Sequence, residues 1–346
     1  GSVTSFENFA ECPLRYYLRY GVDLKEREEF TFSPVNFGVV LHAVIREVCD
    51  EIKKNGESYY LISEEKRREM VKRSVAAITD IYQNSILKDS SRNSFMIKRM
   101  EDLADRTVWA MGEQLKCGDF VPFVFEHKFN MEVGDGDRKQ LMSGTIDRVD
   151  ICENGTDVYV RIIDYKTGKK DFNIVKTYYG IDIQLMVYME AAMKLVAKMR
   201  PGKNVIPAGV FYYNISDPIV SATTESAEEI EDKIKGELRL KGMVNSDKDI
   251  AEKMDNTEGT SLNIPVSRKA DGGFDSRRSK VMNTEQFNIL GRFVDVRAID
   301  TADRIAGGDI RRSPYKDGQF SSCDRCPYGA VCGFSVDLPG CNYRKL

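Results

Sequence analysis

The feature that most constrains the fold is an apolar run that ends in an acid and a lysine, Val158-Tyr159-Val160-Arg161-Ile162-Ile163-Asp164-Tyr165-Lys166-Thr167-Gly168. Its β-branched and aromatic residues predict a strand. Successive side chains of a strand point to opposite faces, so Asp164 and Lys166 share a face with the apolar residues of even number.

A second predicted strand, 140–151, precedes this one, and Glu153-Asn154-Gly155-Thr156 joins the two. Asn-Gly between two β-rich runs is typical of a type I′ hairpin, because both central residues need a positive φ. With Asn154 and Gly155 as the loop, Glu153 pairs with Thr156 and Asp147 lies opposite Ile162. The shared face then carries Val149, Ile151, Val158, Val160 and Ile162, and at its far end Asp147, Asp164 and Lys166.

Two carboxylates and an ammonium at the end of an apolar sheet face predict a metal site. Mg²⁺ prefers carboxylate oxygens and usually keeps water and phosphate as its other ligands. A bound metal lowers the pKa of its water and stabilises charge on a phosphodiester under attack, and a neighbouring lysine can orient that water or offset the charge. The alternative is a hairpin end with solvated charges, in which Asp164 and Lys166 form a weak surface pair.

The composition is that of an ordinary globular protein. The 346 residues, 42% hydrophobic and 30% charged, are enough for one large domain or two. A net charge of −3 argues against a broad nucleic-acid-coating surface, although a local groove remains possible. There is no visible signal peptide or apolar run of about 18 residues, which favours a cytoplasmic protein. Gly1-Ser2 resembles a cloning scar, and the chain lacks an initiator Met, so we expect an excised domain.

Apolar periodicity divides the rest of the chain into helices and strands within one domain, 1–346. We predict helices at 5–18, 35–54, 63–87, 94–116, 178–199 and 284–306, strands at 121–133 and 205–213, a turn at 134–137, and an insertion or mobile lobe at 216–280. Strand 121–133 includes Glu126, which could assist the site or serve the fold. Gln184 and Tyr188 are four residues apart on one helix face, so both could point toward the end of the hairpin. Alternatively, they are an exposed Gln and a core Tyr.

The C-terminal tail carries Cys323-x2-Cys326-x5-Cys332, with Cys341 beyond. In a chain without secretory features, this spacing indicates metal ligation rather than disulfides. Three close cysteines need a fourth ligand, since tetrahedral Zn²⁺ and iron–sulfur clusters usually take four. Cys341 would complete a local zinc site, and Cys12 would complete a cluster that joins the two chain ends.

Several short motifs occur in a characteristic order. They are Ser5-Phe6-x-x-Phe9-x-x-Cys12-Pro13, Gly38-x-x-x-His42, Gly144-Thr145-Ile146-Asp147-Arg148, Asp164-Tyr165-Lys166-Thr167-Gly168 and Gln184-Leu185-x-x-Tyr188. Together with the cysteine tail, they resemble the RecB-type branch of the PD-(D/E)xK nucleases. Within it, the chain resembles most closely the C-terminal nuclease domain of the AddB-type subunits of bacterial helicase–nucleases.

The resemblance implies an α/β fold with a restriction-endonuclease-like core, in which helices flank a central mixed sheet and an iron–sulfur staple joins the N- and C-terminal segments. By this resemblance His42, Asp147 and Asp164 are metal ligands and Lys166 is the catalytic lysine. Gln184 and Tyr188 correspond to a supporting motif that contacts the site or the DNA. Four cysteines correspond to the [4Fe–4S] ligands, namely Cys12, Cys323, Cys326 and Cys332, and leave Cys341 spare.

The implied function is a Mg²⁺- or Mn²⁺-dependent exonuclease that acts on a single-stranded DNA end during double-strand-break processing, with an AddA-type helicase–nuclease subunit as its partner. No G-x-x-x-x-G-K-[ST] motif for ATP is present. Two alternatives remain open, a standalone RecB-like exonuclease of the CRISPR-associated type and a catalytically silent DNA-binding scaffold.

Overall fold

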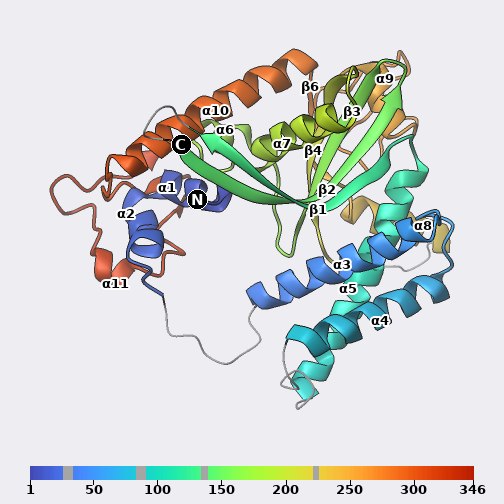
Figure 1. The fold of residues 1–346 in the computed structure, drawn as a ribbon, viewed down its shortest axis with the longest axis horizontal. Helices are drawn as coiled ribbons and strands as arrows, with labels where there is room; N and C mark the ends of the chain where they lie inside the picture. The colour runs from blue at the N-terminus through green and yellow to red at the C-terminus, as the bar shows by residue number, and fades with distance from the viewer. Residues whose placement is uncertain (26–33, 83–90, 134–138, 221–225) are drawn as a thin grey trace.

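The computed structural model describes residues 1–25, 34–82, 91–133, 139–220 and 226–346. Its centre is a sheet of strands that lie side by side in chain order (Figure 1): β1 (Val121–Val133), β2 (Gln140–Asn154), β3 (Asp157–Lys166), β4 (Asn204–Asn214), β5 (Lys241–Asn245) and β6 (Val281–Met282). The β3–β4 and β5–β6 pairs are parallel and the others are antiparallel. The predicted mixed sheet is therefore confirmed.

Helices cover both faces of this sheet (Figure 1). One face packs against α1 (Val3–Glu11), α7 (Gln184–Met199) and α10 (Thr284–Ala306), and the other against α3 (Pro34–Lys54), α4 (Glu64–Tyr82) and α5 (Ser91–Lys116). The shorter elements are α2 (Pro13–Tyr16), the π-helical turn η1 (Tyr17–Gly21), α6 (Ile174–Tyr178), α8 (Ala227–Glu237), α9 (Lys248–Met254) and α11 (Gly329–Cys332). A small second sheet is built from β7 (Tyr315–Asp317), β8 (Phe320–Ser321) and β9 (Arg344–Lys345).

The register of the β2–β3 hairpin differs from the predicted one by two residues. Asn154 pairs with Asp157, so the loop is Gly155-Thr156, and Gly155 takes the positive φ of 59°. Asn154 is the last residue of β2, and its side-chain amide donates to the Tyr159 hydroxyl (3.2 Å). Val149, not Asp147, therefore lies opposite Ile162. A shift of two residues leaves every side chain on its predicted face, whereas a shift of one would have reversed them all.

The apolar residues of that face are confirmed as core. The buried cluster under α7 includes all five predicted positions, Val149, Ile151, Val158, Val160 and Ile162. The apolar stripe of α3 lies in the core of the opposite face, and it consists of Phe37, Leu41, Val44, Ile45, Val48 and Ile52. Both hydrophobic cores therefore pack against the β2–β3 hairpin.

The opposite face of the hairpin buries three charged side chains, Arg148, Asp150 and Arg161, each 0% exposed. Arg148 donates to both carboxylate oxygens of Asp150 (2.7 and 2.6 Å), and Arg161 donates to one of them (2.8 Å). The guanidinium of Arg161 also lies over the Phe120 ring, 4.8 Å from its centroid. Burial is costly for each of these charges unless the others remain in place.

We therefore expect Asp150→Asn to lower the free energy of unfolding by about 3 kcal/mol, because two guanidinium groups lose their shared anion inside the protein. Denaturant titration measures the change. The matched control is Asp157→Asn at the half-buried start of β3, where the carboxylate accepts a surface hydrogen bond from Asn204, and we expect a loss below about 0.5 kcal/mol there. Equal effects of the two substitutions would contradict the role assigned to the buried trio.

Most predicted elements are found, and the largest differences in limits concern two helices. The predicted N-terminal helix begins at Val3 rather than Ser5, because Ser2 is the N-cap, and it breaks at Cys12, whose extended backbone (φ −165°) precedes Pro13. The predicted helix 178–199 is shorter in the structure, where α7 starts at Gln184 after a turn at Gly180 (φ 77°). Strand 121–133 and helix 284–306 are confirmed to the residue.

The segment 216–280, expected to be an insertion or lobe, adds β5 to the central sheet and buries several apolar side chains in the core, among them Leu238, Leu240, Val244, Ile264 and Val266. The turn predicted at 134–137 and the helix end predicted at Leu87 lie outside the described residues. Within the described ranges, no helix has the length and apolar character that crossing a membrane requires.

Candidate active site at the end of the hairpin

The end of the hairpin farthest from its turn brings Asp147 and Asp164 together. Asp147 Oδ2 accepts a hydrogen bond from the backbone N–H of Tyr165 (2.6 Å), which fixes the carboxylate beside β3. The two side chains are 7% and 2% exposed. Burial, reinforced by the charge of Asp147, raises the pKa of Asp164 to about 7. Two acids held this close in a dry site favour a cation between or beside them.

An imidazole and a further carboxylate converge on Asp147. His42 Nδ1, from α3, lies 3.5 Å from Asp147 Oδ1 and 3.7 Å from Glu126 Oε1 of β1. Burial alone would lower the pKa of His42, but the two carboxylates outweigh it and raise the pKa to about 10. One ligand atom from each of the three side chains lies within 4.8 Å of the others. The chemistry of this donor set, one nitrogen and two carboxylate oxygens, fits a single divalent metal ion.

Glu126 is the member of this group whose role the sequence left open. It has a φ of 47°, a left-handed conformation that is rare for a residue with a side chain. Its neighbours Phe125 and His127 pair with Arg148 and Ile146, so Glu126 lies in the register of Asp147. Backbone strain of this kind concentrates at functional sites. No pattern in the sequence signals the strain, because it depends on the pairing of β1 with β2.

Lys166 lies on the other side of Asp164. Its ammonium is 2.6 Å from Asp164 Oδ2 and donates to Gln184 Oε1 (2.9 Å). Gln184 Nε2 in turn donates to the Tyr188 hydroxyl (2.9 Å). Burial alone would lower the pKa of Lys166, but Asp164 holds it above its usual value. Gln184 and Tyr188 therefore do point toward the end of the hairpin, and the alternative of an exposed Gln is excluded, since Gln184 is 8% exposed.

The glycine of the Gly144-Thr145-Ile146-Asp147 motif makes room for this chain of contacts. A Cβ at Gly144 would lie 2.7 Å from the Phe129 ring and 2.9 Å from the Tyr188 ring. These two rings meet edge to face with centroids 5.6 Å apart. A larger residue at position 144 would displace Tyr188 and with it the hydrogen bond to Gln184.

An open groove leads away from the His42 side of the site. It is lined by Val39, His42, Ala43, Arg46, Glu47, Ile78 and Glu126. Arg46 is exposed and lies one turn along α3 from His42, so a cation is available next to the acidic cluster. A chain of phosphates could therefore reach the acidic group past a positive side chain.

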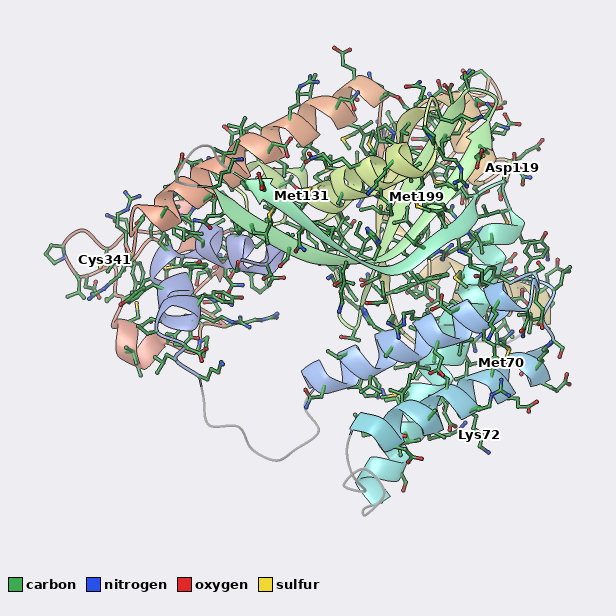
Figure 2. The ribbon with its side chains drawn as sticks, in the orientation of Figure 1. Met70, Lys72, Asp119, Met131, Met199 and Cys341 are labelled. Carbon is green, nitrogen blue, oxygen red and sulfur yellow. The ribbon has the colours of Figure 1, made fainter. Side chains whose placement is uncertain are left out.

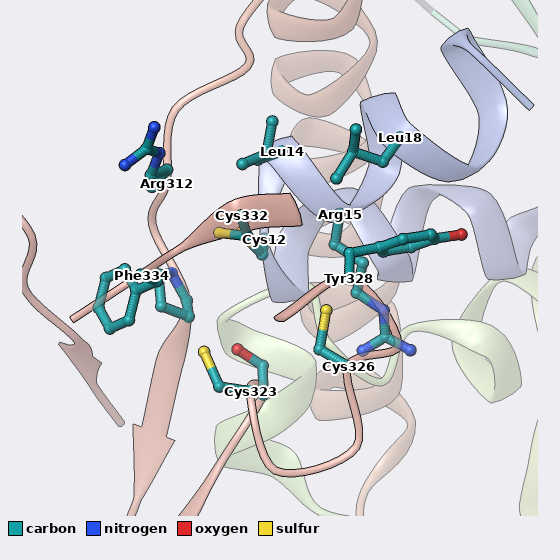
Figure 3. Close-up of a pocket in the computed structure, with 12 residues that line it drawn as sticks. Cys12, Leu14, Arg15, Leu18, Arg312, Cys323, Cys326, Tyr328, Cys332 and Phe334 are labelled. Atoms are coloured by element: carbon teal, nitrogen blue, oxygen red, sulfur yellow. The ribbon is translucent and has the colours of Figure 1, made fainter. Parts of the chain in front are cut away.

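A separate pocket gathers four cysteines from the two ends of the chain (Figure 3). It is lined by Cys12, Cys323, Cys326 and Cys332, together with Leu14, Arg15, Leu18, Arg312, Pro314, Ser322, Tyr328 and Phe334. Burial and the neighbouring thiols raise the pKa of Cys323 and of Cys332. Cys341 belongs to the same C-terminal segment (Figure 2) but is not among the residues that line this pocket. The structure thus groups the four cysteines that the resemblance singled out.

Comparison with known proteins decides the family. A model of the PD-(D/E)XK nuclease superfamily matches residues 1–333. The chain belongs to this superfamily. Its central mixed sheet and the cluster of acids at the hairpin end are thus the core and the candidate metal site of a PD-(D/E)XK nuclease.

Relatives of this PD-(D/E)XK nuclease extend over the whole chain. A protein of Caldanaerobacter subterraneus subsp. tengcongensis, named as the B-type subunit of an ATP-dependent helicase/deoxyribonuclease, is 35% identical, and the match covers 100% of this chain and 30% of that protein. Proteins of the same name from Thermoanaerobacter sp. and Clostridium acetobutylicum are 33% and 34% identical, over 31% and 30% of their lengths. The predicted similarity to these subunits is confirmed, and the chain spans less than a third of each of them.

Proposed function

We propose that this chain is the nuclease domain of a helicase–nuclease subunit and that it hydrolyses phosphodiester bonds at single-stranded DNA ends, in double-strand-break processing, with Mg²⁺ or Mn²⁺. One observation carries the proposal. His42, Glu126 and Asp147 offer a nitrogen and two oxygens within 4.8 Å of one another, next to the Asp164–Lys166 pair. Hard divalent cations take such oxygen-rich sets and complete their shell with water and phosphate.

In this proposal His42, Glu126 and Asp147 hold the metal, and Asp164 supplies a further carboxylate oxygen. The ion, when bound, lowers the pKa of a coordinated water and stabilises charge on the phosphate. Lys166 orients the attacking water or offsets the charge that develops on the phosphoryl oxygens. Gln184 fixes the direction of the Lys166 ammonium through its 2.9 Å hydrogen bond. The other Gln184 contact, to Tyr188, keeps the amide from rotating away.

Metal affinity tests the inclusion of Glu126. We expect Glu126→Gln and His42→Ala each to weaken Mn²⁺ binding at least about tenfold, because each removes one ligand of the group. Isothermal titration calorimetry on the folded domain measures the affinity. The matched control, Glu132→Gln, lies on the same strand, and its carboxylate pairs with exposed Lys139, so its affinity should equal that of the wild type. A Glu126→Gln protein that binds Mn²⁺ as tightly as the wild type would remove Glu126 from the site.

The substrate class follows from the depth of the site and from the relatives. The acids are buried at the sheet end, and the groove past Arg46 is open on one side, which suits a single flexible strand better than an intact duplex. The relatives are named as subunits of an ATP-dependent helicase/deoxyribonuclease, and a helicase supplies opened strands. We therefore propose a single-stranded end as substrate and an AddA-type subunit as the partner of the longer protein.

Linear and circular substrates separate this function from its alternatives. With Mg²⁺, the domain should degrade linear single-stranded DNA at least about tenfold faster than closed circular duplex, and binding should weaken as salt rises because phosphate contacts release counterions. Gel analysis of end-labelled oligonucleotides and of plasmid measures both. Equal rates on the two substrates would contradict end-dependent action, and the absence of metal-dependent cleavage would favour the silent DNA-binding scaffold.

For the cysteine pocket we propose a [4Fe–4S] cluster held by Cys12, Cys323, Cys326 and Cys332, with zinc as the alternative. The gathering of four thiols from both chain ends in one pocket, with Cys341 outside it, supports the cluster. The cluster would tie the N-terminal helices to the C-terminal segment, so we assign it a structural role.

A further inference from the structure

Glu7 connects the N-terminal helix to the helix that carries Gln184. One carboxylate oxygen of Glu7 accepts hydrogen bonds from the backbone N–H groups of Ile183 and Gln184, both at 3.0 Å. These groups are at the start of α7, where N–H groups have no partner within the helix. Ile183, the N-cap residue of α7, makes no side-chain capping bond of its own. The cap of α7 therefore comes from a residue 176 positions earlier in the chain.

The residue that Glu7 fixes at its backbone is the same one that contacts the catalytic lysine with its side chain. Gln184 accepts from Lys166 Nζ at 2.9 Å. The first residues of a helix fray unless they are capped, and a negative charge at this end is also favoured by the helix dipole. Without Glu7, the first turn of α7 would lose its anchor, and the Gln184 amide would lose its fixed position under Lys166.

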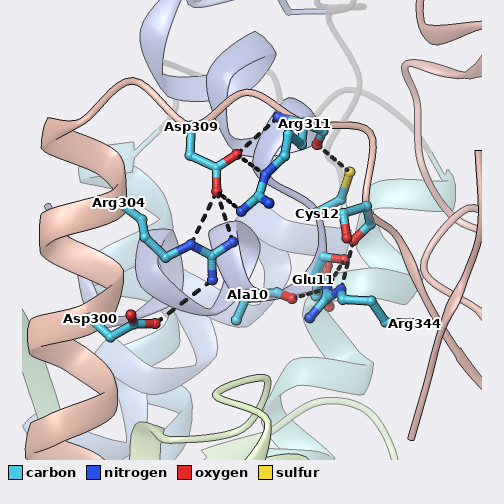
Figure 4. A network of polar contacts seen from close by, with 9 residues as sticks. Ala10, Glu11, Cys12, Asp300, Arg304, Asp309, Arg311 and Arg344 are labelled. Atoms are coloured by element: carbon cyan, nitrogen blue, oxygen red, sulfur yellow. Dashed lines mark hydrogen bonds and ion pairs between the residues drawn. The ribbon is translucent and has the colours of Figure 1, made fainter. Parts of the chain in front are cut away.

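The helix that presents Glu7 is itself held at both ends by elements other than α7. At its start, Gly1 accepts a hydrogen bond from the Ser143 backbone N–H of β2 (2.9 Å). At its end, Arg344 donates to the backbone oxygens of Ala10 and Glu11 (Figure 4). Cys12 of the cysteine pocket follows directly. The helix that carries Glu7 therefore links β2 to the C-terminal segment.

We propose that Glu7 is a positioning residue for Lys166, acting through the first turn of α7 and Gln184. This inference rests on the proposed nuclease function, in which Lys166 is the catalytic lysine. Through Glu7, the helix α1 and the cysteine pocket that follows it would also help to align the site. The Glu7 carboxylate accepts from the backbone N–H groups of α7 and is not one of the proposed metal ligands.

Three single variants test the proposal, and Glu7→Ala is also combined with Gln184→Ala. Glu7→Ala should lower kcat on single-stranded DNA about tenfold or more with KM unchanged, whereas Glu7→Gln, which keeps an oxygen acceptor for both N–H groups, should recover most of that loss. Glu11→Ala is the matched control on the same helix, because its carboxylate pairs with Arg15, and it should leave kcat within about twofold. In a Gln184→Ala background, Glu7→Ala should have little further effect, since the two residues act in series.

A readout independent of activity follows Lys166 directly. Glu7→Ala should raise the rate at which acetic anhydride labels Lys166, measured by mass spectrometry and normalised to exposed Lys169, at least about threefold, and Glu11→Ala should not. Unchanged labelling of Lys166, or a kcat loss for Glu7→Ala that is fully additive with Gln184→Ala, would overturn the proposal. If the wild-type domain showed no metal-dependent cleavage, the proposed function would fail, and the labelling experiment would still decide the positioning role.

Discussion

Replacement of Lys166 by alanine is expected to lower the rate of DNA hydrolysis by about 10³-fold and to leave the thermal midpoint within about 2 °C of the wild-type value. The Lys166 side chain is 28% exposed and lies at the end of the hairpin, 2.6 Å from Asp164 Oδ2, so the apolar cores do not depend on it. In the proposed mechanism, the substitution removes the cation that offsets charge on the scissile phosphate. Single-turnover cleavage with Mg²⁺ and a melting curve measure the two quantities.

Asp164→Ala should have the same effect on the rate, because it removes a proposed metal-binding carboxylate and the ion-pair partner of Lys166 together. The control is Lys169→Ala, five residues further along the same segment and exposed, for which we expect the wild-type rate. An Asp164→Ala protein that cleaved DNA at the parental rate would show that the chemistry occurs elsewhere in the molecule.

Cys12→Ser is expected to remove the bound iron and the visible absorption of the domain. It should also lower the thermal midpoint by about 10 °C or more. A cluster that joins Cys12 to Cys323 closes a loop of roughly 300 residues, and release of such a loop is worth about 5 kcal/mol of unfolding free energy in the chain-entropy model. At about 2 °C per kcal/mol for a domain of this size, the shift is easily measured. Activity should fall only as the fold loosens.

Cys341→Ser is the matched control, because Cys341 is a buried thiol of the same segment that does not line the cysteine pocket. It should keep the colour, and its thermal midpoint should stay close to that of the wild type. A colourless protein with tightly bound zinc, indifferent to Cys12→Ser and unfolded by Cys341→Ser, would establish the local zinc site instead.

The sequence predicted the central hairpin and its faces because both depend on short-range alternation. The predicted loop was wrong, but the assignment of side chains to the two faces was still correct. The true loop, Gly155-Thr156, shifts the register by two residues and so leaves each side chain on the same face. The N-terminal helix was predicted to run through Cys12-Pro13, although the residue before a proline favours an extended backbone and Pro13 begins a new helix.

The candidate site could be predicted where it rests on motifs and not where it rests on tertiary contacts. The motifs pointed to His42, Asp147, Asp164 and Lys166, and the structure brings all four to one end of the hairpin. Glu126 could not be assigned, because its left-handed φ and its approach to His42 arise from strand pairing. The buried Arg148–Asp150–Arg161 trio gave no signal either, since single charges within strands are usually solvated.

The most direct test of the central claim is anomalous diffraction at the manganese edge from crystals of the domain grown with Mn²⁺. The proposed site predicts a strong peak at about 2.1–2.3 Å from the ligand atoms of His42, Glu126 and Asp147, because these are ordinary metal–ligand distances for nitrogen and oxygen. A protein that cleaves DNA with Mn²⁺ but shows its peak at other residues, or none at the end of the hairpin, would contradict the assignment of this site as the nuclease centre.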